Sequence, residues 1–125
     1  MKSVLVLNVD DYAPARYAKT RLLENAGFLV REAANGADAL KMAAALRPEL
    51  MLLDVRLPDI DGMEVCRRIK ANPDLSGINV VQTSSAFTSE EDVEKAYRSG
   101  ADGYLVAPYE PSKLISVLRS LCRPG

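Results

Sequence analysis

The feature that most constrains the fold is a short apolar run that ends in a carboxylate. Leu50 to Leu53 are four consecutive apolar residues, followed by Asp54 and Val55 and then by a loop that contains Pro58. Such a run is typical of a strand that is buried on both faces of a parallel sheet. A carboxylate directly after it lies at the carboxyl end of the strand, where open α/β sheets bind ligands. Asp54 is therefore either a site residue or a cap or turn residue, and its position alone leaves both interpretations open.

Length and charge limit the classes of protein to which this chain can belong. Its 125 residues suffice for one domain, residues 1–125, with its own core. The 16 Lys and Arg nearly balance the 17 Asp and Glu, which argues against direct binding of nucleic acid. The absence of histidine argues against the usual Ser or Cys triad and against a zinc site with the two cysteines. Without a signal peptide or an apolar run of membrane length, we expect a cytoplasmic domain with no membrane insertion.

Strand and helix patterns alternate five times along the chain. Apolar runs predict five strands, at 4–9, 28–33, 50–55, 78–83 and 103–106. Five helices follow them, and each is bounded by residues typical of helix ends: Pro14 and Gly27, Asn35 and Pro48, Gly62 and Asn72, Ser89 and Gly100, and Pro111 and Cys122. Parallel strands joined by helices form a sheet that is covered on both faces. The prediction is a single doubly wound α/β domain.

Two of the helices have apolar residues at helical spacing. The first helix has small and apolar residues at helical spacing: Ala15, Ala18, Leu22 and Ala26. The helix between Ser89 and Gly100 has a narrower stripe, formed by Val93, Ala96 and Tyr97. Much of that helix is therefore expected to be exposed and comparatively easy to shift.

Polar residues follow three of the predicted strands. Asp10 and Asp11 end the first strand, Asp54 ends the third, and Ser84 and Ser85 follow the fourth. In a sheet with the strand order 2-1-3-4-5 these strands are neighbours, and the polar groups would converge at one cleft. Carboxylates in contact repel one another, and a hard divalent cation such as Mg²⁺ resolves that repulsion. Carboxylates, a metal and a hydroxyl form a site that can handle a phosphoryl group.

Four short motifs follow one another along the chain: Asp10-Asp11, Asp54 with Leu57-Pro58-Asp59-Ile60-Asp61-Gly62, Ser85-Ala86, and Gly100-Ala101-Asp102-Gly103-Tyr104-Leu105. Jointly they resemble the response-regulator receiver domain of two-component signalling, and the resemblance covers the whole chain. It implies a flavodoxin-like fold, with five parallel strands in the order 2-1-3-4-5 and five helices. The segments 83–87 and 107–111 are also similar to receivers fused to hybrid histidine kinases.

The resemblance also implies what the site residues do. A histidine kinase would donate a phosphoryl group to Asp54, and the domain would catalyse its own phosphorylation and dephosphorylation. Mg²⁺ would be held by three carboxylates and one main-chain carbonyl, those of Asp10, Asp11, Asp54 and Arg56. The Ser85 hydroxyl would bond a phosphoryl oxygen, and Tyr104 would change rotamer with it. A downstream protein would then bind at the fourth and fifth helices.

Ala107 departs from the family pattern, in which a lysine usually precedes the last proline. In receivers that lysine pairs with the acceptor carboxylate and then with the phosphoryl group. Its absence removes one cation from an acidic pocket, and we expect Arg56, two residues past Asp54, to soften the loss. Two functions are compatible with this sequence. One is a phosphorylatable but weak switch, and the other is a pseudo-receiver that serves as a constitutive protein-docking module.

Two other classes fit the sequence less well. A phosphohydrolase of the haloacid-dehalogenase type would need a second carboxylate two residues after its nucleophile, where this chain has Arg56. A flavodoxin would need a phosphate-binding loop rich in Ser, Thr and Gly after the first strand, where this chain has Asp10 and Asp11.

Overall fold

Five strands and five helices alternate along the chain. The structure, a computed structural model, describes residues 3–85 and 89–122. The elements are β1 (Leu5–Val9), α1 (Ala13–Asn25), β2 (Leu29–Ala33), α2 (Gly36–Leu46), β3 (Leu50–Asp54), α3 (Gly62–Ala71), β4 (Asn79–Ser84), α4 (Glu90–Arg98), β5 (Gly103–Val106) and α5 (Pro111–Leu121). All strands are parallel and lie in one sheet in the order β2-β1-β3-β4-β5. The predicted flavodoxin-like, doubly wound fold is confirmed.

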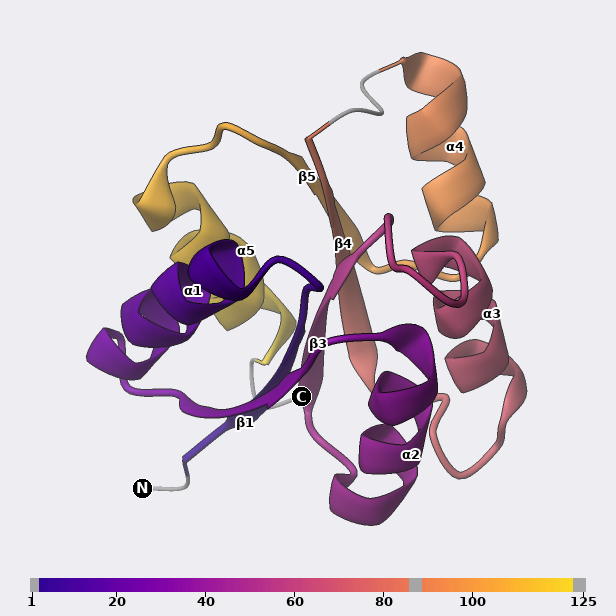
Figure 1. Ribbon diagram of the computed structural model, residues 1–125, viewed down its shortest axis with the longest axis horizontal. Coiled ribbons are helices and arrows are strands. Elements are labelled where there is room, and N and C mark those ends of the chain that lie inside the picture. The colour runs from indigo at the N-terminus through magenta and orange to yellow at the C-terminus, as the bar shows by residue number, and fades with distance from the viewer. Residues whose placement is uncertain (1–2, 86–88, 123–125) are drawn as a thin grey trace.

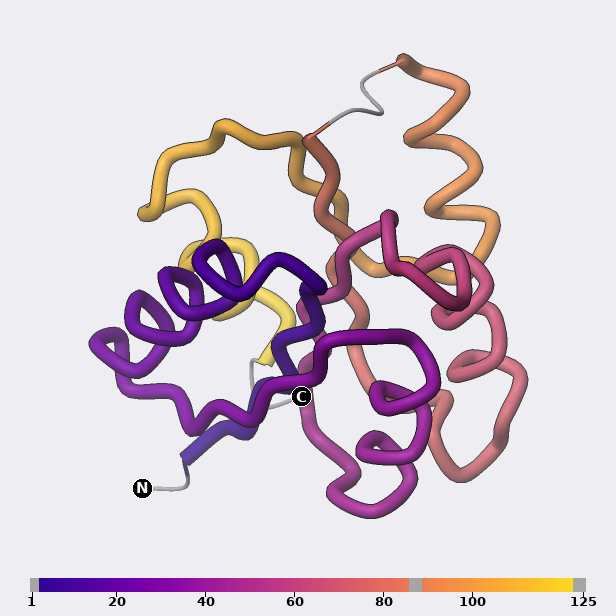
Figure 2. Tube along the Cα trace, viewed as in Figure 1, coloured from indigo at the N-terminus to yellow at the C-terminus, as the bar shows by residue number. Residues whose placement is uncertain are grey.

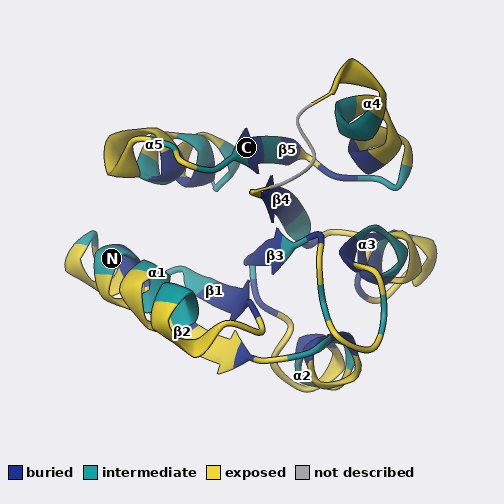
Figure 3. Ribbon diagram, turned by 45° about the horizontal axis from the view of Figure 1, so that its top comes forward, coloured by how far each residue is buried: buried dark blue, intermediate teal, exposed yellow. Residues whose placement is uncertain are grey.

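Helices cover both faces of the sheet. α1 and α5 lie on one face, and α2, α3 and α4 lie on the other (Figure 1). Figure 3 shows that the strands and the inward sides of the helices carry most of the buried residues. Leu23 and Leu114 belong to the core on the first face, while Ala43, Val65 and Ile69 belong to the core on the second. The central strand β3 is fully buried from Leu50 to Leu53, as its apolar run predicts.

The strand register brings the ends of neighbouring strands to one level. Val9 at the end of β1 pairs with Leu53 of β3, and Asp54 pairs with Thr83 of β4. In Figure 2 the chain accordingly leaves β1 and β3 at the same end of the sheet. Residues directly after these strands therefore share one edge, which is where parallel sheets place their ligand sites.

The helices are short, and several begin or end at the predicted residues. The side chains of Asn35 and Ser89 each accept a hydrogen bond from the backbone N–H three residues further on, at the starts of α2 and α4. Gly27 and Gly100 follow α1 and α4 with φ of 99° and 106°, the left-handed region that glycine tolerates. In the described part of the chain, no helix has both the length and the apolarity needed to cross a bilayer.

The buried face of α1 differs from the predicted one. Leu23 is its fully buried residue, whereas Ala18 is exposed and Ala15 and Leu22 are only partly buried. The first half of the helix does not face the core, because Ala15 and Ala18 lie beside a cavity at the carboxyl edge of the sheet. Alanines at helical spacing therefore mark the wall of a cavity here as well as a packing face.

Candidate functional site

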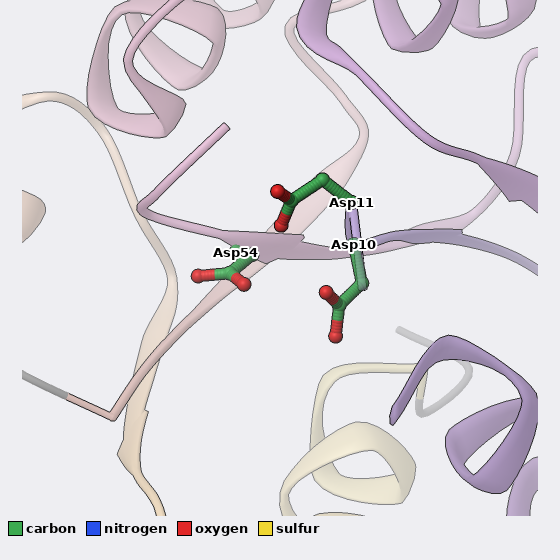
Figure 4. Close-up of side chains that lie close together, drawn as sticks. All are labelled: Asp10, Asp11 and Asp54. Atoms are coloured by element: carbon green, nitrogen blue, oxygen red, sulfur yellow. The ribbon is translucent and has the colours of Figure 1, made fainter. Parts of the chain in front are cut away.

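Three carboxylates meet at the carboxyl edge of the sheet. Asp10 and Asp11 directly follow β1, and Asp54 is the last residue of β3. One oxygen from each lies within 4.8 Å of the others, and Figure 4 shows the three side chains around one space. Asp10 is buried, Asp54 is partly buried and Asp11 is exposed. The cluster is therefore held by the sheet on one side and open to solvent on the other.

The cluster opens into a cavity of about 620 Å³. Besides the three carboxylates, its lining includes two cations, two hydroxyl groups and the segment after β5: Lys19, Arg56, Ser84, Ser85, Ala107 and Tyr109. Arg56, Ser85 and Ala107, singled out from the sequence, thus face the same cavity as the carboxylates. Ala86, the second residue of the Ser85 motif, lies outside the described residues.

Backbone hydrogen bonds hold Asp54 at the cavity. The N–H of Val55 donates to the carbonyl of Thr83 at 2.9 Å, which continues the ladder between β3 and β4 for one residue past the strand. The N–H of Gly62 donates to the carbonyl of Val55 at 2.8 Å, so the loop folds back over Asp54. A Cβ on Gly62 would lie 2.8 Å from the Cα of Val55 and closer still to the carbonyl oxygen of Asp54. Only glycine permits this approach of the two backbones.

The electrostatic surroundings of Asp54 work against its ionisation. Burial is the main cause that raises the pKa of Asp54, and the charges of Asp10 and Asp11 raise it further. The backbone N–H of Arg56, which donates to Oδ1 of Asp54 at 3.1 Å, opposes the shift, as does the charge of Lys19. Three converging carboxylates offer only oxygen ligands and an excess of negative charge. They fit a hard divalent cation of the Mg²⁺ type.

Lys19 is a site residue that the sequence interpretation missed. Its Nζ lies 2.8 Å from Oδ2 of Asp10, and only 13% of the Lys19 side chain and 6% of the Asp10 side chain are exposed. Asp10 also accepts a hydrogen bond from the N–H of Tyr12 at 2.9 Å. The sequence does carry a signal: Lys19 lies four residues after Ala15 and three before Leu22, on the face predicted to be apolar. A lysine on such a face needs a partner.

Tyr109 is the second residue that was missed. It follows Ala107 by two residues, lines the cavity and is partly buried. Burial raises the pKa of the Tyr109 hydroxyl, and the nearby charges of Asp10 and Asp54 raise it further. The N–H of Ala107 donates to the carbonyl of Ser84 at 2.8 Å, and Ala107 is among the residues that line this wall. No property of the sequence distinguishes Tyr109 from the other tyrosines.

Tyr104 lies next to the cavity and is linked to it through Ser84. A hydrogen bond joins the side chains of Tyr104 and Ser84, and burial raises the pKa of Tyr104. Ser84 is buried and lines the cavity, while Ser85 lines it from an exposed position. The last residue of β4 therefore connects the cavity with β5.

Asp59 and Asp61 act in the loop and not in the cluster. The Asp59 carboxylate accepts hydrogen bonds from the N–H groups of Gly36 and Ala37 at 2.8 and 2.9 Å, which lowers its pKa. Asp61 accepts from the N–H of Met63 at 2.7 Å and caps α3. Both carboxylates satisfy the first N–H groups of a helix, as expected for residues that shape the loop.

Comparisons with known sequences point to one family. Residues 6–119 match the response regulator receiver domain family. The chain is 36% identical over 118 residues to the DNA-binding response regulator MtrA of Mycobacterium tuberculosis, an alignment that covers 94% of this chain and 50% of that protein. It is 39% identical over 125 residues to the transcriptional regulatory protein AfsQ1 of Streptomyces coelicolor, covering 100% and 53%. The chain thus spans about half the length of these curated relatives.

Solved structures share the fold over nearly the whole chain. A putative response regulator from Chloroflexus aurantiacus superposes with a TM-score of 0.91 at 28% identity, covering 96% of this chain and 98% of that one. The chemotaxis response regulator CheY4 of Vibrio cholerae gives a TM-score of 0.89 at 28% identity, covering 96% and 99%. The signal receiver domain of a histidine kinase from Syntrophus aciditrophicus gives 0.88 at 28% identity, covering 95% and 89%.

Proposed function

The chain belongs to the response regulator receiver domain family, and on that basis we propose that it accepts a phosphoryl group from a histidine kinase onto Asp54. The observation that carries the proposal is the cluster of Asp10, Asp11 and Asp54, whose oxygens lie within 4.8 Å of one another at the edge of a 620 Å³ cavity. Asp54 is the carboxylate of the three that ends a strand and is held by the loop after it.

Asp54 acts as the nucleophile in the proposed transfer. As one of its oxygens bonds to phosphorus, the phosphorus–nitrogen bond of the donor phosphohistidine breaks, and the departing imidazole takes up a proton from solvent. The N–H of Arg56 binds Oδ1 of Asp54 at 3.1 Å, which orients the carboxylate and favours its ionised form. Ser85 lines the cavity and supplies a hydroxyl for a phosphoryl oxygen.

Asp10, Asp11 and Asp54 would hold Mg²⁺, together with the main-chain carbonyl of Arg56. When bound there, Mg²⁺ would supply positive charge for the phosphoryl oxygens. Asp11 is the exposed carboxylate of the three. Asp10 is buried, and its carboxylate is held by the N–H of Tyr12 and by the ammonium group of Lys19.

A conformational signal would leave the cavity through β4 and β5. The hydrogen bond between Ser84 and Tyr104 links the cavity lining to β5, against which α4 packs. Tyr97 on α4 is 48% exposed and offers an aromatic surface to a partner. We propose that a downstream protein binds at α4 and α5. The domain itself would not bind nucleic acid directly, since its charges are balanced.

A second candidate function is that of a pseudo-receiver that docks a partner without phosphorylation. Ala107 favours it, because the wall of the cavity at the end of β5 carries a methyl group in place of a cation. The intact cluster of Asp10, Asp11 and Asp54 favours phosphorylation, since a docking module has no need for three mutually repelling carboxylates.

Incubation with acetyl phosphate and Mg²⁺ tests the proposal directly. The intact mass of the protein should increase by one phosphoryl group, and Asp54→Asn should abolish the increase. Asp74→Asn is the matched control, because Asp74 is an exposed carboxylate outside the cavity lining. If Asp54→Asn is labelled at the rate of the unaltered protein, the assignment of the acceptor is wrong. If the unaltered protein gains no mass, the docking module becomes the better description.

A further inference from the structure

Lys19 is a nearly buried cation that points into the proposed phosphorylation site. Its side chain is 13% exposed, and its Nζ binds the Asp10 carboxylate at 2.8 Å. Lysine is rarely buried to this extent without a partner of opposite charge. A simpler way to fill this position on α1 is an apolar side chain like those of its helical neighbours Ala15 and Leu22. A lysine here therefore indicates a need for positive charge in the cavity.

The distribution of cations around the cavity also indicates that Lys19 supplies positive charge to the carboxylate cluster. Among the described lining residues, Lys19 and Arg56 carry positive side chains, and Arg56 is exposed. The wall at the end of β5 presents Ala107, Pro108 and Tyr109, none of which is cationic. Partly buried charge is screened less than exposed charge, so Lys19 acts on the cluster more strongly than Arg56. Its charge also acts on Asp54, where it favours ionisation.

A charge balance shows what phosphorylation demands of the cavity. The three carboxylates and Lys19 together carry two negative charges, which a single Mg²⁺ balances. Phosphorylation replaces the single charge of Asp54 by about two charges on the phosphoryl group. If the exposed Arg56 is left out of the balance, the site then holds an excess of about one negative charge with Lys19 and about two without it. A flexible ammonium group on a four-carbon stem can follow the charge from Asp10 to a phosphoryl oxygen.

We propose that Lys19 is the phosphoryl-binding cation of this domain, delivered from α1 instead of from the end of β5. In the unphosphorylated protein it neutralises Asp10, and after transfer it binds an oxygen of the phosphoryl group on Asp54. The inference rests on the proposed function, because it requires phosphorylation at Asp54. It assigns to Lys19 the stabilising role that the sequence alone suggested for Arg56.

Beryllofluoride, which occupies the place of a phosphoryl group on a carboxylate, provides the test. In saturating Mg²⁺, Lys19→Met should lower the affinity for beryllofluoride by about 10- to 100-fold, the size of one charge-assisted hydrogen bond. Mg²⁺ affinity without beryllofluoride should stay the same or increase, because the substitution removes a cation that competes for Asp10. Lys41→Met is the matched control, since Lys41 is an exposed lysine on α2 outside the cavity lining.

Two further variants separate this role from a merely structural one. Ala107→Lys restores a cation from the opposite wall, so it should recover beryllofluoride affinity in the Lys19→Met protein and add less in the unaltered protein. Arg56→Ala should have a smaller effect than Lys19→Met. Circular dichroism of each variant checks that it is folded. If Lys19→Met does not fold, Lys19→Gln provides a polar alternative.

Three results would overturn the inference. If Lys19→Met and Lys19→Gln bind beryllofluoride as tightly as the unaltered protein does, Lys19 only neutralises Asp10. If Ala107→Lys fails to recover the affinity of a folded Lys19→Met protein, the loss comes from altered structure and not from a missing cation. If the unaltered protein binds no beryllofluoride and gains no phosphoryl mass, both this inference and the proposed function fail. If Asp54 is labelled normally and Lys19→Met binds beryllofluoride as tightly as the unaltered protein, this inference fails but the proposed function stands.

Discussion

At the scale of single residues, Asp54 has to satisfy two opposing requirements. As the proposed phosphoryl acceptor, Asp54 must be ionised to act as a nucleophile, yet burial and the charges of Asp10 and Asp11 raise its pKa. The N–H of Arg56 and the charge of Lys19 act in the opposite direction and lower it. The raised pKa means that the ionised form of Asp54 lowers the stability of the metal-free protein.

That cost can be measured by replacing Asp54 with Asn in buffer with a chelator. The pKa of Asp54 is higher in the folded than in the unfolded state, so its ionisation favours unfolding. The unaltered protein keeps the full contribution of protonated Asp54 below the unfolded carboxyl pKa of about 4 and loses it as the pH rises through the folded pKa. Asp54→Asn should therefore raise the urea midpoint at pH 7, and the gain should disappear in acid. A lower midpoint at pH 7 would contradict this account.

Substitution of Asp11 is expected to weaken the binding of Mg²⁺. It is the exposed member of the cluster, and its substitution removes one of three charges that face the ion. Asp11→Asn should weaken Mg²⁺ binding by about tenfold or more, which corresponds to about 1.4 kcal/mol. Isothermal titration calorimetry measures this, with Asp74→Asn as the control that should bind Mg²⁺ normally. Equal affinities of Asp11→Asn and the unaltered protein would rule out a cation site at this cluster.

At the scale of elements, the loop from β3 to α3 fixes the position of Asp54. Asp59 and Asp61 cap α2 and α3 through backbone N–H groups, and Gly62 packs its backbone against that of Asp54. The sequence predicted that Gly62 begins a helix, but it did not predict this close packing. The contact depends on where the loop returns to the strand, which is a property of the folded chain.

Gly62→Ala tests the importance of that packing. The added methyl group would lie 2.8 Å from the Cα of Val55, so the loop or the strand end must move. We expect a loss of about 1–3 kcal/mol in the free energy of unfolding, as for other overpacked sites, and slower labelling of Asp54. Gly77→Ala is the matched control, because a Cβ at Gly77 has no atom within 4 Å. Equal stability of the two variants would show that the loop adapts without strain.

The helices show where sequence reasoning succeeds and where it fails. Val65 and Ile69 of α3 lie four residues apart and are both buried, because one side of this helix is apolar and the other is charged. In α1 the contrast is weaker, since alanines occupy both the core side and the cavity side. The rotation of α1 is set by Leu23 and by its contacts with the sheet, and only the folded structure reveals that Lys19 reaches Asp10.

At the scale of the whole molecule, the topology made the carboxylate cluster predictable. Asp10, Asp11 and Asp54 follow apolar runs, and the order of parallel strands brings those ends together whatever the details of packing. Lys19 and Tyr109 come from a helix and from the segment after β5, and their directions depend on tertiary packing. The backbone scaffold of the site could therefore be derived from the sequence, whereas the charge balance around it could not.

The same topology separates the cavity from the surface where we expect the signal to leave. α4 has a single fully buried residue among those described, Ala96, and it packs mainly against β5, which is linked to the cavity through Ser84 and Tyr104. An element with so few buried contacts opens and shifts at low cost. A structural change that passes from the cavity to β5 should therefore shift α4 first and α2 much less.

Hydrogen exchange with and without beryllofluoride and Mg²⁺ tests this expectation. Backbone amides of α4 should change their exchange rates severalfold on binding. We expect the ligand to alter the Ser84–Tyr104 hydrogen bond, which links the cavity to β5, and α4 packs against β5. Amides near Ala39 and Ala43 in α2, which are buried on the same face of the sheet, serve as the internal control and should change little. Identical exchange in α4 with the ligand demonstrably bound would mean that the cavity is not coupled to this surface. The domain would then act as a phosphoryl carrier or a docking module, because a switch requires the two states to differ where the partner binds.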